Sequence, residues 1–178
     1  MREMSAYTTV FTVWGHAMAQ SVRGPRKKPV VSISIARHLR QRDRQAIEDG
    51  IYAFNVQATG IGNGRLLTLL LRDGRKRLRG GLLGHTWGGC LTVTHIWIHP
   101  AFRYQGHGTR LLSAAEAQGR ARRCRASLLW THSFQARGFY EQLGYRVVAH
   151  LSDYPFGHEQ FCMRKTLRAP HASRRSRD

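Results

Sequence analysis

The residues whose types and spacing could do chemistry are concentrated in one stretch, 96–109. An apolar run ends at Pro100, and Gly106 and Gly108 then open a predicted helix. Glycines at such a turn let the backbone approach a ligand closely and direct several N–H groups toward one point. The positive end of the helix dipole and the charge of Arg103 strengthen that point. The stretch therefore predicts an anion cradle of the kind that holds a pyrophosphate.

A second informative stretch, 133–145, predicts a short helix. Ser133 is a suitable N-cap residue and Gly144 a suitable stop. One apolar face between them contains Ala136, Phe139, Tyr140 and Leu143. Phe139 is expected to pack inward. Because adjacent residues lie about 100° apart on a helix, Tyr140 can be either a second core residue or a side chain that faces a ligand.

Cysteine and histidine show no pattern of a metal or disulfide framework. Cys90, Cys124 and Cys162 are widely spaced and form no CxxC motif, and the ten histidines form no HExxH motif. We therefore expect neither a metal nor a disulfide framework, and a reducing compartment is the simplest interpretation.

The elements that position these residues follow from the period of the apolar residues. The first helix is expected to begin at Asp43 as its N-cap and to present Ile47, Ile51, Phe54 and Ala58 on one face. The expected order is a strand over 30–35, this helix, strands over 66–71, 78–87 and 91–98, a helix over 108–122, a strand over 127–130, the helix after Ser133, and strands over 145–151 and 160–167. This order predicts an α/β (α+β) domain with a mixed sheet.

The composition indicates one cationic globular domain. The chain has 178 residues, 29 Lys and Arg against 10 Asp and Glu, and a formal net charge of +19. We expect 1–29 to be a disordered or mis-annotated extension, 30–167 to be the domain, and 168–178 to be a basic flexible tail. No apolar run approaches the roughly 18 residues of a membrane-spanning helix. Two interpretations of this charge stay open: it serves a polyanionic partner, or it reflects a general bias of the sequence toward arginine.

Two motifs together resemble the GNAT superfamily of N-acetyltransferases. The first is Arg103-x-x-Gly106-x-Gly108 after a strand, which is similar to the acetyl-CoA-binding motif of that superfamily. The second is the helix of 134–145, which looks like its "A-x-x-F-Y-x-x-x-G-F" helix with Tyr145 in the last aromatic place. The resemblance covers about 30–167. It implies a mixed, largely antiparallel central sheet, flanked by helices and splayed between the fourth and fifth strands.

The resemblance also implies roles for individual residues. Acetyl-CoA is the implied co-substrate, and the backbone of β-structure near Ile96, Trp97 and Ile98 is expected to bind its pantetheine arm. The expected pyrophosphate site is Arg103, Tyr104, Gln105, Gly106, His107, Gly108 and Thr109, mainly through backbone N–H groups. Tyr140 matches the tyrosine that protonates the departing thiolate as a general acid.

The general base is not identified by the sequence. Members of the superfamily often use a glutamate on the strand before the phosphate loop or a chain of waters, and this strand contains no carboxylate. His95 is a candidate because the unperturbed pKa of histidine suits base chemistry at neutral pH. His85, His132 and Asp153 are alternatives. Glu116 is expected to serve packing or pairing rather than chemistry.

The predicted function is acetyl transfer from acetyl-CoA to a primary amine of a small molecule. Direct transfer is expected because neither Cys90 nor Cys124 has an evident activating partner. The alternatives are a protein or peptide amine acetyltransferase, a non-catalytic acyl-CoA-sensing domain, and a basic nucleic-acid-binding protein. We expect a cytoplasmic monomer or homodimer without a specific nucleic acid or a membrane as partner.

Overall fold

A six-stranded sheet dominates the structure, a computed structural model that describes residues 31–167. These residues fall into two parts, 31–40 and 41–167, and the sheet belongs to the second. The strands are β1 (Arg65–Arg72), β2 (Leu78–Trp87), β3 (Cys90–Ile98), β4 (Ala126–His132), β5 (Arg146–Leu151) and β6 (Gln160–Thr166), and the helices are α1 (Gln41–Thr59), α2 (His107–Ala121) and α3 (Arg137–Gln142). The strands lie in the order β1-β2-β3-β4-β6-β5.

The centre of the sheet is open at one end. β3 and β4 are parallel, and the other neighbouring strands are antiparallel. The pairing of β3 with β4 stops at Val93 and Leu129, although β3 continues to Ile98 and β4 to His132. The two strands therefore separate beyond this point. This confirms the predicted mixed, largely antiparallel sheet and its splay between the strands expected as fourth and fifth.

A β-bulge in β3 marks the point where the strands separate. On the side of β2, Leu83 pairs with His95 and Gly84 pairs with Val93, so Thr94 is an extra residue in β3. The hydroxyl of Thr94 donates a hydrogen bond to the backbone oxygen of Leu83 at 3.1 Å. The side chain of the extra residue in β3 therefore holds the bulge against β2.

The bulge reverses which side chains of β3 face the core. Val93 is buried before it, and Ile96 packs against the same core after it. His95 is exposed, although unbroken alternation would have turned it into the core. A side chain at Gly84 would collide with the backbone of Thr92, so this close approach of β2 to the bulge requires glycine.

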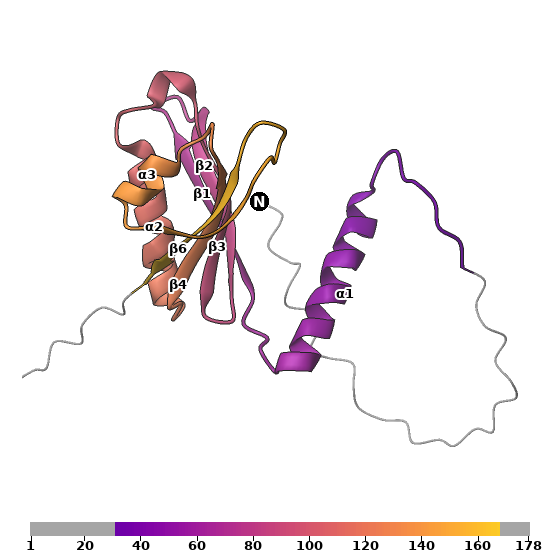
Figure 1. The fold of residues 1–178 in the computed structure, drawn as a ribbon. Helices are drawn as coiled ribbons and strands as arrows, with labels where there is room; N and C mark the ends of the chain where they lie inside the picture. The colour runs from indigo at the N-terminus through magenta and orange to yellow at the C-terminus, as the bar shows by residue number, and fades with distance from the viewer. Residues whose placement is uncertain (1–30, 168–178) are drawn as a thin grey trace, which may run out of the picture. The chain divides into compact units, whose positions relative to one another are not determined.

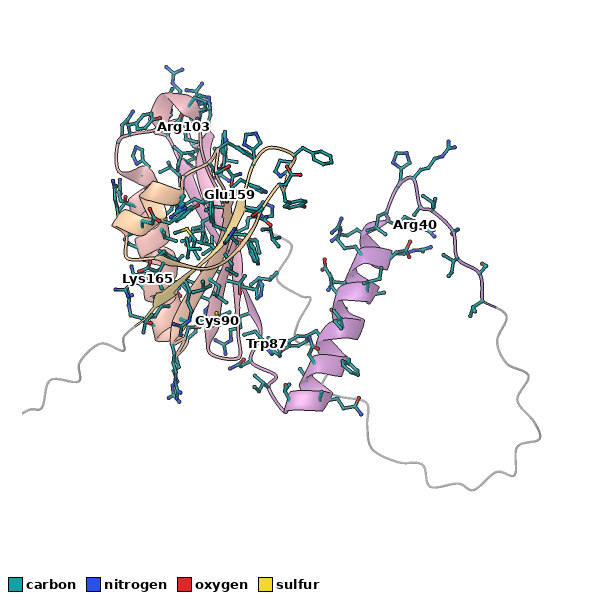
Figure 2. All side chains as sticks on the ribbon, in the orientation of Figure 1. Arg40, Trp87, Cys90, Arg103, Glu159 and Lys165 are labelled. Carbon is teal, nitrogen blue, oxygen red and sulfur yellow. The ribbon has the colours of Figure 1, made fainter. Side chains whose placement is uncertain are left out.

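Helices α2 and α3 lie on the same side of the sheet (Figure 1). α2 contacts β1, β2 and β3, and its buried residues Leu111, Leu112 and Ala115 pack into the core cluster. Its Glu116 is buried and receives two hydrogen bonds from the Nζ of Lys165, at 2.9 and 2.7 Å. Lys165 can be followed in Figure 2. Glu116 thus joins α2 to β6, which agrees with the expected structural role.

The predicted strand over 30–35 is wrong for the residues that the structure describes. Residues 31–36 have no regular secondary structure, and Val31, Ile33 and Ile35 are exposed. Their alternation of apolar and polar residues suits a strand, but alternation alone does not make one, because a strand also needs backbone hydrogen bonds to a partner strand. Val30, together with the two predicted terminal segments 1–29 and 168–178, lies outside the described residues. The predicted domain limits stay a prediction.

Two predicted helix caps are also wrong. α1 begins at Gln41, so Asp43 lies in its first turn, and no residue of α1 is buried. α3 has Ala136 as its N-cap residue because the hydroxyl of Ser133 is used elsewhere. That hydroxyl accepts a hydrogen bond from the backbone N–H of Glu159 at 3.2 Å. No helix within residues 31–167 is long and apolar enough to span a membrane.

Candidate active site

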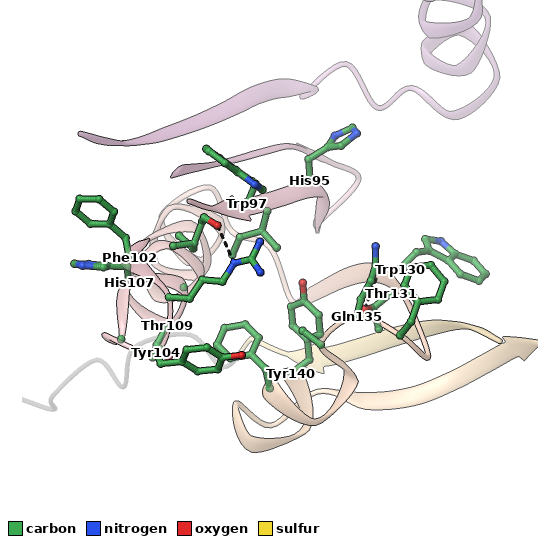
Figure 3. Close-up of a pocket in the computed structure, with 18 of the residues that line it drawn as sticks. His95, Trp97, Phe102, Tyr104, His107, Thr109, Trp130, Thr131, Gln135 and Tyr140 are labelled. Atoms are coloured by element: carbon green, nitrogen blue, oxygen red, sulfur yellow. Dashed lines mark hydrogen bonds between the residues drawn. The ribbon is translucent and has the colours of Figure 1, made fainter. Parts of the chain in front are cut away.

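A cavity of about 870 Å³ occupies the open end of the sheet between β3 and β4. It extends from the loop before α2 to the end of β4, and α3 forms part of its wall. Figure 3 shows His107 and Thr109 at one end, Trp130 and Gln135 at the other, and Tyr140 between them. The lining residues are Thr94, His95, Ile96, Trp97, Ile98, Phe102, Arg103, Tyr104, Gly106, His107, Gly108, Thr109, Trp130, Thr131, Phe134, Gln135, Ala136, Phe139 and Tyr140.

The loop before α2 exposes hydrogen-bond donors to the cavity. Gly106 is the N-cap of α2 with a φ of 76°, which favours glycine. The first residue of the helix to donate a backbone hydrogen bond is Arg110, to Gly106. The preceding N–H groups of His107, Gly108 and Thr109 donate to no residue of the described chain, as expected at a helix N-terminus. They are available to an anion together with the positive end of the helix dipole.

Arg103 adds a full positive charge at the same end. Its Nε donates a hydrogen bond to the backbone oxygen of Ile98 at 3.1 Å, which joins the loop to the end of β3. Gly108 lies close to α3, because a Cβ there would be 3.3 Å from the ring of Phe139. The Nδ1 of His107 is buried and has no hydrogen-bond partner within residues 31–167.

Nine of the ten residues predicted to bind the co-substrate line this cavity. The exception is Gln105, whose side-chain amide donates to the backbone oxygen of Ala101 at 3.1 Å. Gln105 therefore stabilises the loop through this internal hydrogen bond and does not line the cavity. The side chain of Tyr104 is fully exposed at the margin of the cavity.

The loop is supported from behind by the β1–β2 hairpin. The Nη2 of Arg79 lies 2.8 Å from a carboxylate oxygen of Asp73, and its guanidinium lies 5.3 Å from the ring centre of Phe102. The backbone N–H of His99 donates to the oxygen of Arg79 at 2.8 Å. Burial alone would raise the pKa of Asp73, but hydrogen bonds from Arg77, Arg79 and Arg75 lower it to about 2. Asp73 therefore stays ionised at neutral pH and holds Arg79 beneath the loop.

Tyr140 combines the two alternatives left open by the sequence. Its ring is buried in the core, in edge contact with Phe139 at 5.1 Å and with Tyr145 at 6.0 Å. Its hydroxyl points into the cavity (Figure 3) and has no hydrogen-bond partner among the described residues. Burial raises the pKa of Tyr140 to about 12. At neutral pH the hydroxyl therefore carries a proton that it can donate.

Tyr145, the other tyrosine of the motif, has a different environment. It is fully buried, and its hydroxyl donates to the Oγ of Ser127 at 2.8 Å. Burial raises the pKa of Tyr145 well above its usual range. Because the hydroxyl is committed to Ser127, Tyr145 is a core residue.

Of the four candidate bases, His95 lies in the wall of the cavity. The bulge turns it out of the core, and its Nδ1 lies 3.1 Å from the hydroxyl of Thr94. His85 and His132 are not part of the cavity wall. The carboxylate of Asp153 accepts a hydrogen bond from the backbone N–H of Gly157 at 2.6 Å and is held in a turn. The geometry thus favours His95 over the other three.

None of the three cysteines lines the cavity. Cys90 lies at the opposite end of the sheet from Arg103 (Figure 2). Burial raises the pKa of Cys90, Cys124 and Cys162, so each is a poor nucleophile at neutral pH. Within residues 31–167 no group of three His, Cys, Asp or Glu side chains could hold a metal ion.

Two groups of residues at the site were missed by the sequence prediction. One is the support of the loop by Arg79 and Phe102, for which the sequence carries no local signal. The other is Trp130 and Phe134, which line the far end of the cavity. Their signal was available, because aromatic residues and histidines are dense around 130–134 in a stretch without Lys or Arg.

A sheet that opens between two parallel strands, next to a glycine-containing loop and a helix N-terminus, defines the GNAT class of acetyltransferases. Residues 64–147 match the model of the acetyltransferase (GNAT) domain. An acetyltransferase of Agrobacterium fabrum is 33% identical over 107 residues, which cover 60% of this chain and 78% of the relative. The chain therefore belongs to the GNAT family and is an acyltransferase by class.

Two further similarities bear on the fold and the substrate. The chain is 43% identical over 84 residues to the blasticidin-S acetyltransferase of Streptomyces morookaense, which is 47% of this chain and 62% of that relative. The match thus spans less than two thirds of that protein. The crystal structure of an acetyltransferase from Agrobacterium tumefaciens superposes with a TM-score of 0.68 at 27% identity, covering 76% of this chain and 99% of the other.

Proposed function

We propose that this protein transfers an acetyl group from acetyl-CoA directly to the primary amine of a small molecule. The observation that carries the proposal is the position of the Tyr140 hydroxyl. It projects, without a partner among the described residues, into a cavity between unpaired edges of two strands, while a positively charged loop closes one end of that cavity. A general acid and an anion site in one cavity suit a thioester attached to a polyphosphorylated carrier.

The residues at the loop end suit the pyrophosphate of coenzyme A. Three free backbone N–H groups at 107–109, the helix dipole and Arg103 supply donors and positive charge together. The edge of β3 that separates from β4 at 94–98 has backbone groups available for an extended amide-bearing arm such as pantetheine. Bound there, the co-substrate supplies an activated acetyl group.

The side chains of this site then have defined tasks. A base takes a proton from the incoming ammonium group, and His95 is the side chain that we assign to this task. The free amine forms a C–N bond with the acetyl carbonyl carbon, and the carbon–sulfur bond of the thioester breaks. Tyr140 gives its proton to the departing sulfur, and the proton that the attacking nitrogen loses as it becomes the amide restores the neutral Tyr140 through solvent. A backbone N–H on the open edge of β3 can stabilise negative charge on the carbonyl oxygen.

A small-molecule acceptor is supported by the relatives, and charge limits which amines suit the site. The Streptomyces relative is named for acetylation of blasticidin S, which makes an antibiotic a reasonable first acceptor. The net charge of +19 disfavours strongly polycationic acceptors through repulsion. We further propose a cytoplasmic location, because the cysteines of the described chain are free thiols, and a monomer or homodimer as the assembly.

Two measurements test this function. Acetyl-CoA at about 100 times its Kd should raise the melting temperature by about 5–10 °C, because it binds only the native state. Arg103→Ala should reduce that shift, whereas the exposed Arg146→Ala serves as a charge-matched control that keeps it. Thiol release in the presence of a panel of amines and peptides then identifies the acceptor class. No thermal shift at saturating acetyl-CoA would refute the proposal.

A further inference from the structure

An aromatic cluster lies at the end of the cavity remote from α2. The rings in mutual contact are His132 and Phe134, from the end of β4 and just after it, and Tyr154 and His158, from the turn between β5 and β6. Trp130, near the end of β4, joins them as a neighbour of Phe134 in the cavity wall. His132 stacks on Phe134 with ring centres 5.1 Å apart and an interplanar angle of 15°. His158 meets Phe134 edge-on at 4.9 Å, and Tyr154 lies 6.0 Å from His132.

The cluster presents open ring surface toward a ligand. Trp130, Phe134 and Tyr154 are exposed by 51%, 56% and 55%. Trp130 and Phe134 are also part of the cavity wall, so this surface is continuous with the space into which Tyr140 projects. A ring placed on this surface would therefore lie in the same cavity as the proposed general acid.

Hydrogen bonds fix the cluster before any ligand is present. The backbone N–H of Ser133 donates to the oxygen of Glu159 at 2.8 Å, and the N–H of Glu159 donates to the Oγ of Ser133 at 3.2 Å. Within the turn, the N–H of Tyr154 donates to the oxygen of His158 at 2.8 Å. The rings are thus held in place, which reduces the entropic cost of binding.

The charge of the cluster is opposite to that of the rest of the chain. The segments 126–136 and 147–163 contain two carboxylates, Asp153 and Glu159, and no Lys or Arg. The other end of the cavity contains Arg103, and the net charge of the chain is +19. Among the lining residues Arg103 stands at the loop end and the aromatic end has no Lys or Arg, while Asp153 and Glu159 lie outside the lining, in the turn that carries Tyr154 and His158. Aromatic faces attract both planar rings and cations.

We infer that this cluster binds a planar aromatic or heteroaromatic ring of the acceptor and so directs the acceptor's amine toward Tyr140. The inference rests on the proposed function and narrows the acceptor to primary amines that carry such a ring. Stacking on Phe134 and Trp130 supplies the recognition, and the two carboxylates favour the cationic amine form that approaches from solvent.

The test compares two amines that differ in planarity. 2-Phenylethylamine and 2-cyclohexylethylamine have similar size, charge and apolar surface, but only the first can stack. Binding of each is measured by equilibrium dialysis in the presence of saturating CoA, so that turnover is not required. We expect the planar amine to bind about three- to tenfold more tightly, as stacking energies predict. Equal affinities would overturn the inference.

Substitutions at Phe134 test whether its ring is responsible for the preference for the planar amine. Phe134→Leu keeps an apolar side chain without a ring and should abolish the preference for the planar amine, whereas Phe134→Tyr should restore it. Phe156→Leu is the matched control, because Phe156 is 91% exposed in the same turn and belongs to none of the ring contacts. A preference that persists in Phe134→Leu would overturn the inference.

Two further readouts separate this inference from the proposed function. The thermal shift by acetyl-CoA should be the same in Phe134→Leu as in the unmodified protein, so loss of that shift in the unmodified protein is a failure of the proposed function alone. Binding of the planar amine should also survive added CoA. If CoA displaces it competitively, the ring surface belongs to the adenine of the co-substrate, and the inference is overturned.

Discussion

Replacement of Tyr140 by Phe should abolish most of the turnover while leaving the fold intact. The ring keeps its packing against Phe139 and Tyr145, and the lost hydroxyl has no hydrogen-bond partner among the described residues. The free energy of unfolding should therefore change by less than about 1 kcal/mol. Loss of a general acid typically lowers kcat by about 10²- to 10⁴-fold, which is about 3–5 kcal/mol of transition-state stabilisation.

Tyr145→Phe is the matched control, because it should lower the stability of the fold and leave turnover unchanged. It removes the hydroxyl that donates to the buried Oγ of Ser127, so it should destabilise the fold by about 1–3 kcal/mol and leave kcat nearly unchanged. Urea unfolding measures the stabilities, and thiol release at saturating acetyl-CoA and amine measures kcat. If Tyr140→Phe retains the full kcat, or if both variants lose turnover equally, the assignment of Tyr140 as the acid is wrong.

The pH profile gives an independent check on Tyr140. The acid must be protonated, so turnover is lost as the pH rises through its pKa. Burial raises that pKa to about 12, whereas an ordinary tyrosine ionises near 10. The kcat of the unmodified protein should therefore not decrease between about pH 8 and about pH 10. A decrease there that persists in Tyr140→Phe would arise from another group.

Three further predictions concern the framework around the site. Gly84→Ala places a Cβ against the backbone of Thr92 at the bulge, and it should cost about 1–3 kcal/mol in urea unfolding and lower kcat/KM. Glu116→Gln alone should lower the free energy of unfolding by about 3 kcal/mol, because it leaves Lys165 without its charged partner. The double variant Glu116→Gln/Lys165→Met should lose less stability than Glu116→Gln alone, which a double-mutant cycle measures. Because hydrogen bonds lower the pKa of Asp73 to about 2, its contribution to stability should be complete above about pH 4 and decrease toward about pH 2, and acid unfolding of Asp73→Asn should lack this component.

Elements with strong local signals were predictable from the sequence. The end of β3 at Ile98, shortly before Pro100, the glycine-containing loop and the start of α2 were placed within one or two residues, because proline, glycine and apolar periodicity act over short distances. The two motifs together also gave the family and the splay of the sheet. Nine of the ten predicted co-substrate residues line one cavity for the same reason.

Features that depend on distant partners were not predictable. A strand was expected at 30–35, but alternation alone cannot show whether a partner strand is present. Ser133 is a good N-cap residue by type, but the turn around Glu159 uses its hydroxyl. The position of the bulge at Thr94 depends on the close approach of Gly84 from another strand. Each of these outcomes was decided by a tertiary contact.

The measurement that tests the central claim most directly is mass spectrometry of both the amine and the protein during turnover. Direct transfer predicts one N-acetylated amine for each thiol released, with no acetyl group on the protein and no thiol release before an amine is added. The raised thiol pKa values and the absence of cysteine from the cavity wall support this outcome. An amine-independent burst of thiol with acetyl on Cys90, Cys124 or Cys162 would contradict the account.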